Sequence, residues 1–373
     1  MTKAAELAKM GEVLTNSQIG GRRNIAINGA MKIAQRSTSE TGLGASTGYF
    51  TLDRYRLDCS ATAGRLTMEQ VAVTDLSGFA NAMKLTCTTA DTSIAAGEIL
   101  GIRQFFEGQD VQQLKKGTSD AEKFTVSFFV KGNANATYTC EISDTDNTRI
   151  IAQEFSVTSS WNRVVLTFDG DTTGVYDDDN ARSMDFSIFL HAGSSFTGGT
   201  FSSNTYHATD NQRIGDNQTS FFDSTDRTFF FTGLQIEVGS QATPFEHRSY
   251  GEELALCQRY CYVINGNLTE SAGGPLGMGH MRANNAAYCQ VYFPVPMRTY
   301  PTSVTVSDVG DFQIVTYGIS NNSCTTISIQ EITERSALLN LEVSPTPFTV
   351  GDGANFTIND TTNGQIIFEG AEL

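Results

Sequence analysis

Positive charge is scarce in this chain. Its 373 residues include 25 lysines and arginines but 41 aspartates and glutamates, which gives a formal net charge of -16 at pH 7. A protein that binds a nucleic-acid backbone needs the opposite balance, because its affinity comes from cationic side chains that neutralise phosphates. The composition therefore excludes nucleic acid as a partner, and it excludes binding to anionic lipid through a polybasic segment.

Long apolar runs are also missing. A helix that spans a bilayer needs about 20 consecutive, mostly apolar residues, and no stretch of the sequence approaches that length. The N-terminal residues MTKAAELAKMGEV contain Glu6 and Glu12 and have no apolar core. We therefore expect neither a secretory signal nor membrane insertion.

The cysteines lack the spacing of a metal site. They are seven in number and scattered: Cys59, Cys87, Cys140, Cys257, Cys261, Cys289 and Cys324. Cys257 and Cys261 are close, but no histidine or second cysteine pair follows at zinc-finger spacing. We interpret all seven as small core side chains. Free thiols fit synthesis in a reducing bacterial cytoplasm.

Signatures of catalysis are nearly absent. The four histidines have no serine or cysteine nucleophile motif beside them, and no G-x-S-x-G occurs. The glycine-rich run at 273–279 lacks the lysine and the strand-to-helix setting of a phosphate-binding loop. Asp177, Asp178 and Asp179 lack the alternating spacing of a calcium loop, so we interpret them as a solvated turn. The sequence predicts no catalytic residue, no metal and no cofactor.

Residues 21–245 are predicted to form a β-domain. Apolar and polar residues alternate with a period of two, as in strands with one buried face, in the segments 55–59, 65–73, 83–88, 99–106, 124–131, 137–143, 150–157, 163–168, 186–191 and 229–238. Loops rich in Gly, Ser, Thr and Asp separate them, which favours an antiparallel sandwich, and a jelly roll suits about ten such strands. Asn28-Gly29 predicts a two-residue hairpin within 25–33.

A short helix and a second β-domain follow. Glu252 and Glu253 stand where a helix N-terminus prefers negative charge, so we expect a connecting helix over 246–258. Residues 259–373 then alternate in several more strand-like segments and are predicted to form a small β-sandwich.

The N-terminal arm, residues 1–20, carries one apolar stripe. Leu7, Met10 and Leu14 fall at i, i+3 and i+7 of a helix. A helix this short is marginal alone, so the stripe needs a partner, either further copies around a symmetry axis or a socket on another protein. A frayed terminus is the other interpretation. The predicted fold class is all-β, with a helical arm, a jelly-roll sandwich, a connecting helix and a second small β-sandwich.

Three segments carry a resemblance to a known family. They are NIAINGAMKIAQR near Asn28, SSWNRVVLTF near Trp161, and the sequence from FTGLQIEVGS to LALCQRYCY over 231–262. Together they resemble the carbohydrate-binding-module-like structural proteins of tailed bacteriophages, seen in short tail or head fibres. The resemblance covers most of the first two thirds of the chain. It implies a virion protein, made in the bacterial host cytoplasm, that contributes to attachment to host-surface glycans.

Two functions of different classes stay open. The first is a fibre or appendage, anchored by its arm, whose β-domains touch host-surface glycans. The second is a capsid-decorating or tail-associated structural protein without receptor binding. A polysaccharide depolymerase is a distant third, because it needs a close pair of carboxylates and composition nominates none among 41 acidic residues. Sandwiches of this kind host many functions, so the resemblance supports a virion role more firmly than a receptor role.

Aromatic residues in two polar loops are the predicted glycan contacts. Loops 170–182 and 192–220 supply Asp, Asn, Thr, Tyr and Phe on a rigid scaffold, as a binding surface requires. The candidate contacts are Tyr176, Phe196, Phe201 and Tyr206. Trp161, the single tryptophan, precedes the strand 163–168, and we interpret it as a core anchor in preference to a sugar platform.

Symmetry predicts a homotrimer. Fibre proteins bind along rotation axes, and closed cyclic symmetry lets identical sandwiches bury an apolar flank. Tyr288, Val291, Phe293 and Val295 offer such a flank beside prolines that mark a sheet edge. We expect trimer contacts there, with a dimer as the second choice, and contacts to other virion proteins through the arm.

Overall fold

The computed structural model describes residues 3, 23–265, 274–316, 319–359 and 364–373. They form two units that divide between Glu253 and Leu254, within helix α4 (Tyr250–Gln258). Both units are built from β-strands, so the predicted all-β class with a short helix is confirmed. Among the described residues, no helix has the length and hydropathy needed to cross a membrane.

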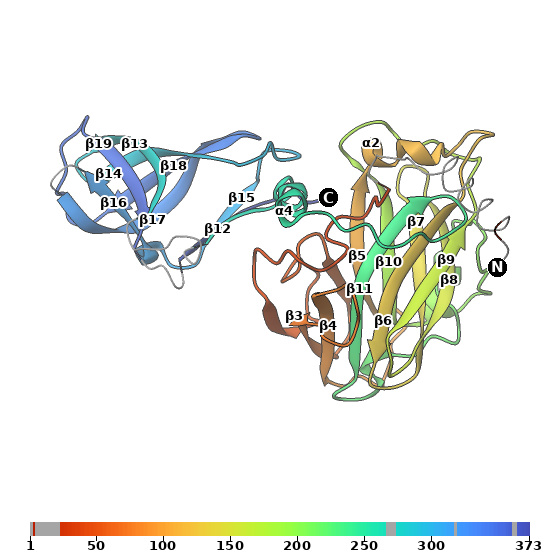
Figure 1. Ribbon diagram of the computed structural model, residues 1–373. Coiled ribbons are helices and arrows are strands. Elements are labelled where there is room, and N and C mark those ends of the chain that lie inside the picture. The colour runs from red at the N-terminus through yellow and green to blue at the C-terminus, as the bar shows by residue number, and fades with distance from the viewer. Residues whose placement is uncertain (1–2, 4–22, 266–273, 317–318, 360–363) are drawn as a thin grey trace. The chain divides into compact units, whose positions relative to one another are not determined.

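Two antiparallel sheets form the sandwich of the N-terminal unit, layered face to face in Figure 1. The first has the order β1-β3-β4-β11-β6-β9 and the second β2-β5-β10-β7-β8. Their strands are β1 (Ser39–Leu43), β2 (Arg56–Ser60), β3 (Arg65–Ala72), β4 (Asn81–Thr89), β5 (Ile99–Glu107), β6 (Phe124–Gly132), β7 (Ala136–Asp144), β8 (Arg149–Val157), β9 (Asn162–Phe168), β10 (Arg182–Ala192) and β11 (Thr228–Val238). Short helical turns are α2 (Gly108–Val111), η1 (Gln112–Leu114), α3 (Ser194–Thr197), η2 (Asp210–Gln212) and η3 (Phe221–Asp223).

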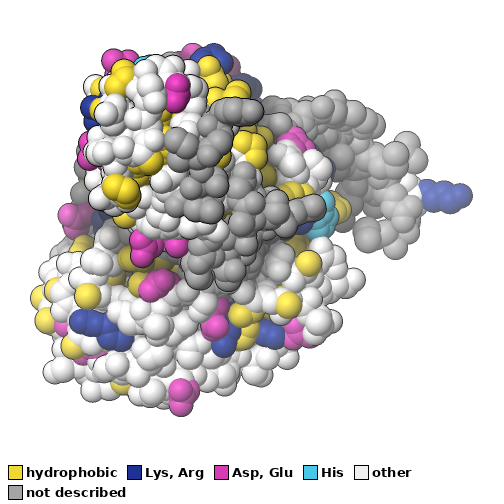
Figure 2. Space-filling model, turned by 90° about the vertical axis from the view of Figure 1, so that its left-hand side faces the viewer, with side chains coloured by type: hydrophobic (Ala, Val, Ile, Leu, Met, Phe, Trp, Pro, Cys, Tyr) yellow, Lys and Arg dark blue, Asp and Glu magenta, His cyan; other side chains and the backbone are white. Residues whose placement is uncertain are grey.

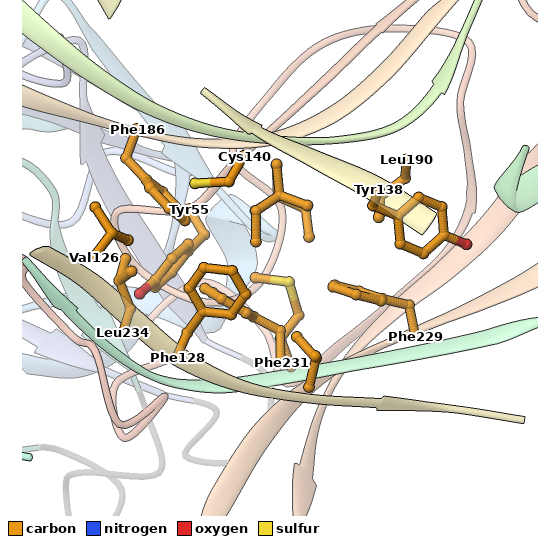
Figure 3. Close-up of a cluster of buried hydrophobic side chains, with 14 of the residues drawn as sticks. Tyr55, Val126, Phe128, Tyr138, Cys140, Phe186, Leu190, Phe229, Phe231 and Leu234 are labelled. Carbon is orange, nitrogen blue, oxygen red and sulfur yellow. The ribbon is translucent and has the colours of Figure 1, made fainter. Parts of the chain in front are cut away.

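The core of this unit forms where the inner faces of the two sheets meet. Aromatic rings from three strands lie together there, as Figure 3 shows: Phe128 of β6, Phe186 of β10 and Phe231 of β11. The ring centroids of Phe128 and Phe231 are 5.5 Å apart in an edge-to-face arrangement. All three side chains are fully buried. The alternation that predicts the strands thus also selects the side chains of the core.

The predicted hairpin at Asn28-Gly29 is wrong. Asn28 has the positive φ of 57° that the dipeptide suggests, but no strand forms on either side of it. The Asn28 side chain instead bridges neighbouring chain segments, because its Nδ2 donates to Ile33 O at 2.8 Å and to Asp53 O at 3.0 Å. Gly29 is not among the glycines with positive φ, so the type I′ turn does not form, and the backbone around Asn28 pairs elsewhere.

Segment 24–33 pairs with the far end of the same unit. Ile25 N donates to Ile236 O of β11 at 2.9 Å. The buried Arg248 side chain donates through Nη1 to Ala26 O at 2.8 Å. These bonds hold the start of the unit against its end, so the backbone groups of the segment are satisfied without a local sheet.

The C-terminal unit contains a closed barrel rather than the predicted small sandwich (Figure 1). Six strands close in the order β13-β14-β18-β17-β16-β19, and a three-stranded sheet has the order β12-β20-β15. The elements are β12 (Tyr262–Asn265), β13 (Pro275–Ala283), β14 (Ala286–Tyr292), β15 (Ser303–Val306), η5 (Val309–Asp311), β16 (Phe312–Thr316), β17 (Ile319–Ile332), β18 (Ser336–Val343), β19 (Gly353–Ile358) and β20 (Gln365–Glu369). Because β19 pairs with both β13 and β16, the six-stranded sheet meets itself.

Two of the four residues predicted to form the trimer contact are buried in the C-terminal unit. Val291 and Phe293 are 2 % and 8 % exposed and belong to the core of this unit. Tyr288 and Val295 are half-buried. The prediction of one apolar flank made of these four residues is therefore wrong, because alternation along β14 sends Val291 inward and Tyr288 outward.

Candidate functional site

The structure does not gather the four predicted glycan contacts into one exposed surface. Tyr176 is 5 % exposed and belongs to the main core, so its prediction as a solvent-facing contact is wrong. Tyr206 is half-buried against the same core. Phe196 is half-buried against a separate small cluster of buried residues. Phe201 is also half-buried.

A buried ammonium group explains why Tyr176 points inward. Lys116 Nζ forms ion pairs with Asp144 at 2.5 Å and Asp171 at 3.2 Å. It also donates to the carbonyl oxygens of Thr173 and Gly174, both at 2.8 Å. These contacts draw the loop that follows β9 onto the sandwich. The ammonium then lies 5.2 Å from the centre of the Tyr176 ring, in a cation–π contact.

A pocket of about 360 Å³ opens beside this lysine. It is lined by Val111, Gln112, Lys115, Lys116, Thr118, Asp120, Val175 and Tyr176. Of the predicted contacts, Tyr176 alone lines it. Only 5 % of Tyr176 is exposed, so this pocket does not offer an open aromatic platform for a sugar.

Trp161 lies on the outer face of the six-stranded sheet, which makes the core-anchor interpretation wrong. It is half-buried and stands outside the main core. Alternation gives the physical reason, because Val164 and Leu166 of β9 point inward and odd-numbered neighbours therefore point outward. Val165, with the same parity as Trp161, is 47 % exposed. The rejected alternative, an aromatic platform on the surface, is what the geometry supports.

Three neighbours position the tryptophan, and with it they form what we term the Trp161 surface: Trp161, Asp75, Lys131 and Phe230. The indole Nε1 donates to Asp75 Oδ1 at 2.9 Å. Phe230 of β11 meets the indole edge-to-face, with ring centroids 6.1 Å apart. Lys131 Nζ of β6 lies 4.9 Å from the centroid of each ring. Register explains the grouping, because Phe230 pairs directly with Lys131 across the two strands.

The two charged groups of the Trp161 surface form an ion pair. Lys131 Nζ lies 2.5 Å from Asp75 Oδ2. Hydrogen bonds from the side chains of Lys131 and Trp161 lower the pKa of Asp75, so the carboxylate is ionised at neutral pH. The Asp75 side chain is 57 % exposed, so its oxygens remain accessible to solvent. The Asp75 carboxylate, which accepts hydrogen bonds, and the Lys131 ammonium group, which donates them, thus lie beside the rings of Trp161 and Phe230.

Polar side chains extend this surface along the sheet. Lys84 of β4 lies directly opposite Phe230 of β11 in the sheet. It forms an ion pair with Glu69 of β3 at 3.1 Å. Both charged side chains are partly exposed. A carbohydrate suits such a surface, because the apolar face of a pyranose packs on an aromatic ring while its hydroxyl groups exchange hydrogen bonds with charged neighbours. The arrangement provides binding groups and no nucleophile.

One hydrogen-bonded row of side chains has the residue types of a catalytic triad: Ser220, His191 and Glu98. Ser220 Oγ lies 2.8 Å from His191 Nδ1, and His191 Nε2 lies 3.0 Å from Glu98 Oε2. The histidine is fully buried. Phe222 N donates to Ser220 Oγ at 3.1 Å, so the hydroxyl caps η3. Because the histidine is fully buried and the serine hydroxyl caps a helical turn, we interpret this hydrogen-bonded row as an internal brace.

Glu154 is the described carboxyl group that bears on the depolymerase alternative. Burial, and secondarily the charge of Asp216, raises the pKa of Glu154, the property expected of a general acid. However, the Glu154 carboxyl group packs on Gly215 so closely that a Cβ there would lie 1.9 Å from Oε1. This oxygen therefore faces the backbone of Gly215.

The described residues contain no cluster of three or more His, Cys, Asp or Glu side chains that could hold a metal ion. Asp177, Asp178 and Asp179 are exposed, as expected of a solvated turn. All seven cysteines are buried, as expected of core side chains. Burial raises the pKa of Cys289 to about 12, so its thiol is unreactive at neutral pH.

The predicted anchoring residues of the N-terminal arm lie outside the described residues: Leu7, Met10 and Leu14.

Comparison with known proteins gives similarity at the level of solved structures. No family model matches the chain, and no curated protein matches it. A CBM4 structure is 12 % identical, with a TM-score of 0.30 over 57 % of this chain and 98 % of its own. TmCBM61 in complex with β-1,4-galactotriose is 8 % identical, with a TM-score of 0.32 over 58 % of this chain and 100 % of its own.

A third similar structure is the CBM22-1 xylan-binding domain of Xyn10C from Paenibacillus barcinonensis. It is 9 % identical, with a TM-score of 0.27 over 55 % of this chain and 99 % of its own. All three are thus carbohydrate-binding modules. Identities and TM-scores this low carry no inference about a ligand or its position, so the function has to be argued from the residues of this chain.

Proposed function

We propose that this chain is a bacteriophage virion structural protein, a short tail or head fibre or appendage that binds host-surface glycans. The virion role rests on the sequence resemblance around Asn28, Trp161 and 231–262. The glycan role rests on the Trp161 surface, where the single tryptophan of the chain lies outside the core, beside one carboxylate and one ammonium group. In this proposal the protein is non-enzymatic, assembles in the bacterial cytoplasm and functions in the particle.

Replacing Trp161 with alanine is expected to weaken polysaccharide binding by about thirtyfold. A central aromatic anchor typically contributes about 2 kcal/mol or more to binding, which corresponds to that factor. Retardation of the full chain in native gels that contain β-glucan, xylan, galactan or a bacterial O-antigen polysaccharide measures the affinity. The length of each polysaccharide should remain unchanged after incubation with the protein, because the proposed site binds and does not cleave.

Tyr250→Ala is the matched control for this measurement. Tyr250 is also an aromatic residue of the N-terminal unit and is 61 % exposed, but it lies outside the Trp161 surface. The control variant should migrate like the wild-type protein in every gel. If Trp161→Ala is retarded as strongly as Tyr250→Ala, the glycan role of the Trp161 surface is refuted, and the decorating role without receptor binding is left.

The proposed anchor is the N-terminal arm with Leu7, Met10 and Leu14. A short apolar stripe gains stability only against a partner, and closed symmetry around a particle axis favours a homotrimer held there together with other virion proteins. Deleting residues 1–18 should leave both β-units folded, as judged by circular dichroism, and abolish incorporation into particles. Truncated protein that co-purifies with virions at normal occupancy would contradict this proposal.

A further inference from the structure

Strands β13, β14 and β18 are neighbours in the C-terminal barrel (Figure 1). Their burial pattern places several aromatic and amide side chains on the outer face of these strands. Six residues define what we term the tyrosine face: Met278, His280, Tyr288, Gln290, Tyr292 and Asn340. Met281, Cys289 and Leu339, which alternate with them along the strands, are fully buried in the core of this unit. Met278 and Tyr292 are 72 % and 70 % exposed, the most exposed of the large apolar side chains described.

Strand register arranges these residues in cross-strand rows. His280 pairs with Tyr288, and Tyr288 pairs with Asn340. The rings of His280 and Tyr288 meet edge-to-face, with centroids 6.1 Å apart. Tyr292 lies four residues along the strand from Tyr288, which is about 13 Å in extended chain. The two tyrosines therefore stand on the same side of one strand, far enough apart to contact two non-adjacent rings of one oligosaccharide.

Hydrogen bonds tie the rings to amide groups. The Tyr292 hydroxyl donates to Gln290 Oε1 at 3.0 Å. Gln290 Nε2 in turn donates to the hydroxyl of Ser336, at 3.3 Å. Tyrosine and amide side chains provide apolar contact and both donors and acceptors at a low cost in conformational entropy, which is why they dominate adaptable recognition surfaces.

Charge on the tyrosine face is balanced, although the chain as a whole is strongly acidic. Next to it, Arg282 lies over the Tyr288 ring, with its Cζ 5.2 Å from the centroid. The same guanidinium donates to Asn340 Oδ1 at 2.7 Å and forms an ion pair with Glu342 at 3.1 Å. A nearby cation paired with its own carboxylate neither attracts nor repels charged partners strongly. The face thus complements an uncharged ligand.

We infer that the tyrosine face is a second saccharide-binding site, which takes a neutral oligosaccharide or polysaccharide chain independently of the Trp161 surface. The ligand lies along β14, with sugar rings packed on Tyr288 and Tyr292 and hydroxyl groups hydrogen-bonded to Gln290 and Asn340. Two weak sites on one chain would raise the avidity for a polymer that reaches both, and several copies on a particle would raise it further.

The test is made in full-length protein that already carries Trp161→Ala, so that the first site does not contribute. Native gels containing β-glucan, xylan, galactan or dextran measure retardation. The single variant is expected to be retarded in at least one gel, and adding Tyr292→Ala is expected to weaken that retardation at least about tenfold. Adding Tyr292→Phe, which keeps the ring, should preserve most of it. Adding Tyr300→Ala should have no effect, because Tyr300 is an exposed tyrosine of the same unit outside the face.

The outcomes separate the two sites. Absence of retardation in the Trp161→Ala variant overturns the tyrosine face as an independent site while leaving the Trp161 surface supported. Equal retardation with and without Tyr292→Ala also overturns it. If Tyr292→Ala lowers the sedimentation coefficient, the face is a contact between copies of the chain, and the saccharide assignment is again overturned. A loss of retardation with an unchanged sedimentation coefficient supports it.

Discussion

Replacing Lys116 with methionine is expected to lower the free energy of unfolding of the N-terminal unit by about 3–5 kcal/mol. The Lys116 side chain is 4 % exposed, and its carboxylate partners Asp144 and Asp171 are 1 % and 4 % exposed. Methionine fills a similar volume but leaves the Asp144 carboxylate without its cation in a water-poor site. Removing one member of a buried ion pair costs far more than the pair contributes, because the remaining charge stays desolvated.

Urea unfolding followed by tryptophan fluorescence measures this loss directly. Trp161 is the only tryptophan and belongs to the N-terminal unit, so its emission reports on that unit and not on the barrel. Lys115→Met is the matched control, because Lys115 is the adjacent lysine but is 52 % exposed and pairs at the surface with Glu122. Equal unfolding midpoints for the two variants would show that the buried centre does not support the sandwich.

The buried ion pairs of Lys116 with Asp144 and Asp171 also make the stability of the N-terminal unit depend on pH. Burial acts to raise the pKa of Asp171, but hydrogen bonds from the Arg149 side chain and from Thr173 N–H, together with Lys116, lower it on balance. A carboxyl group whose pKa is lower in the folded state stabilises the protein above its unfolded pKa of about 3.9 and loses that contribution as the pH falls further. Asp171→Asn should flatten this acid dependence below about pH 4.

Phe231→Ala is the second large effect, with an expected loss of about 3–5 kcal/mol. Figure 3 shows the Phe231 side chain among the core residues of both sheets. Its ring meets Tyr55 edge-to-face at 5.9 Å, and its neighbours Phe186 and Phe229 are stacked on it at 6.2 and 6.4 Å. Alanine would leave a cavity that the surrounding strands cannot close.

The preceding residue provides the contrast for this experiment. Phe230 points to the opposite face of β11, where it is half-buried beside Trp161. Phe230→Ala should therefore cost much less stability than Phe231→Ala, yet weaken polysaccharide binding. Urea unfolding and native-gel retardation measured on both variants check this pair. If the stability losses are equal, the assignment of the two faces of β11 is wrong.

Alternation in the sequence predicts most strands because a strand with one buried face must alternate. It predicts β9 from Val164, Leu166 and Phe168, and carrying the same parity back to Trp161 places that residue outside the core. The sequence does not predict β1, because SETGL contains no alternating apolar residues. Such a strand is fixed by pairing with β3, and a partner strand is not visible in local sequence.

Other features could not be predicted because they depend on distant contacts. Tyr176 is buried by Lys116, a residue 60 positions earlier that shows no local sign of its role. Closure of the barrel depends on β19 pairing on both sides, which a list of strands does not reveal. The grouping of Asp75 with Trp161 joins a loop to a strand end across the sheet. The local sequence pattern thus predicts the strands, whereas the position of the site depends on contacts between residues that are far apart in the sequence.

The bonds between segment 24–33 and the end of the N-terminal unit set an order for folding. The hydrogen bond from Arg248 to Ala26 joins residues that are 222 positions apart. Contacts this distant form late, because the entropy of a long loop must be lost before they stabilise anything. During synthesis, the first segment therefore lacks its partners in β11 and Arg248 until both have left the ribosome. Folding of the N-terminal unit can be completed only when nearly all of its residues have been translated.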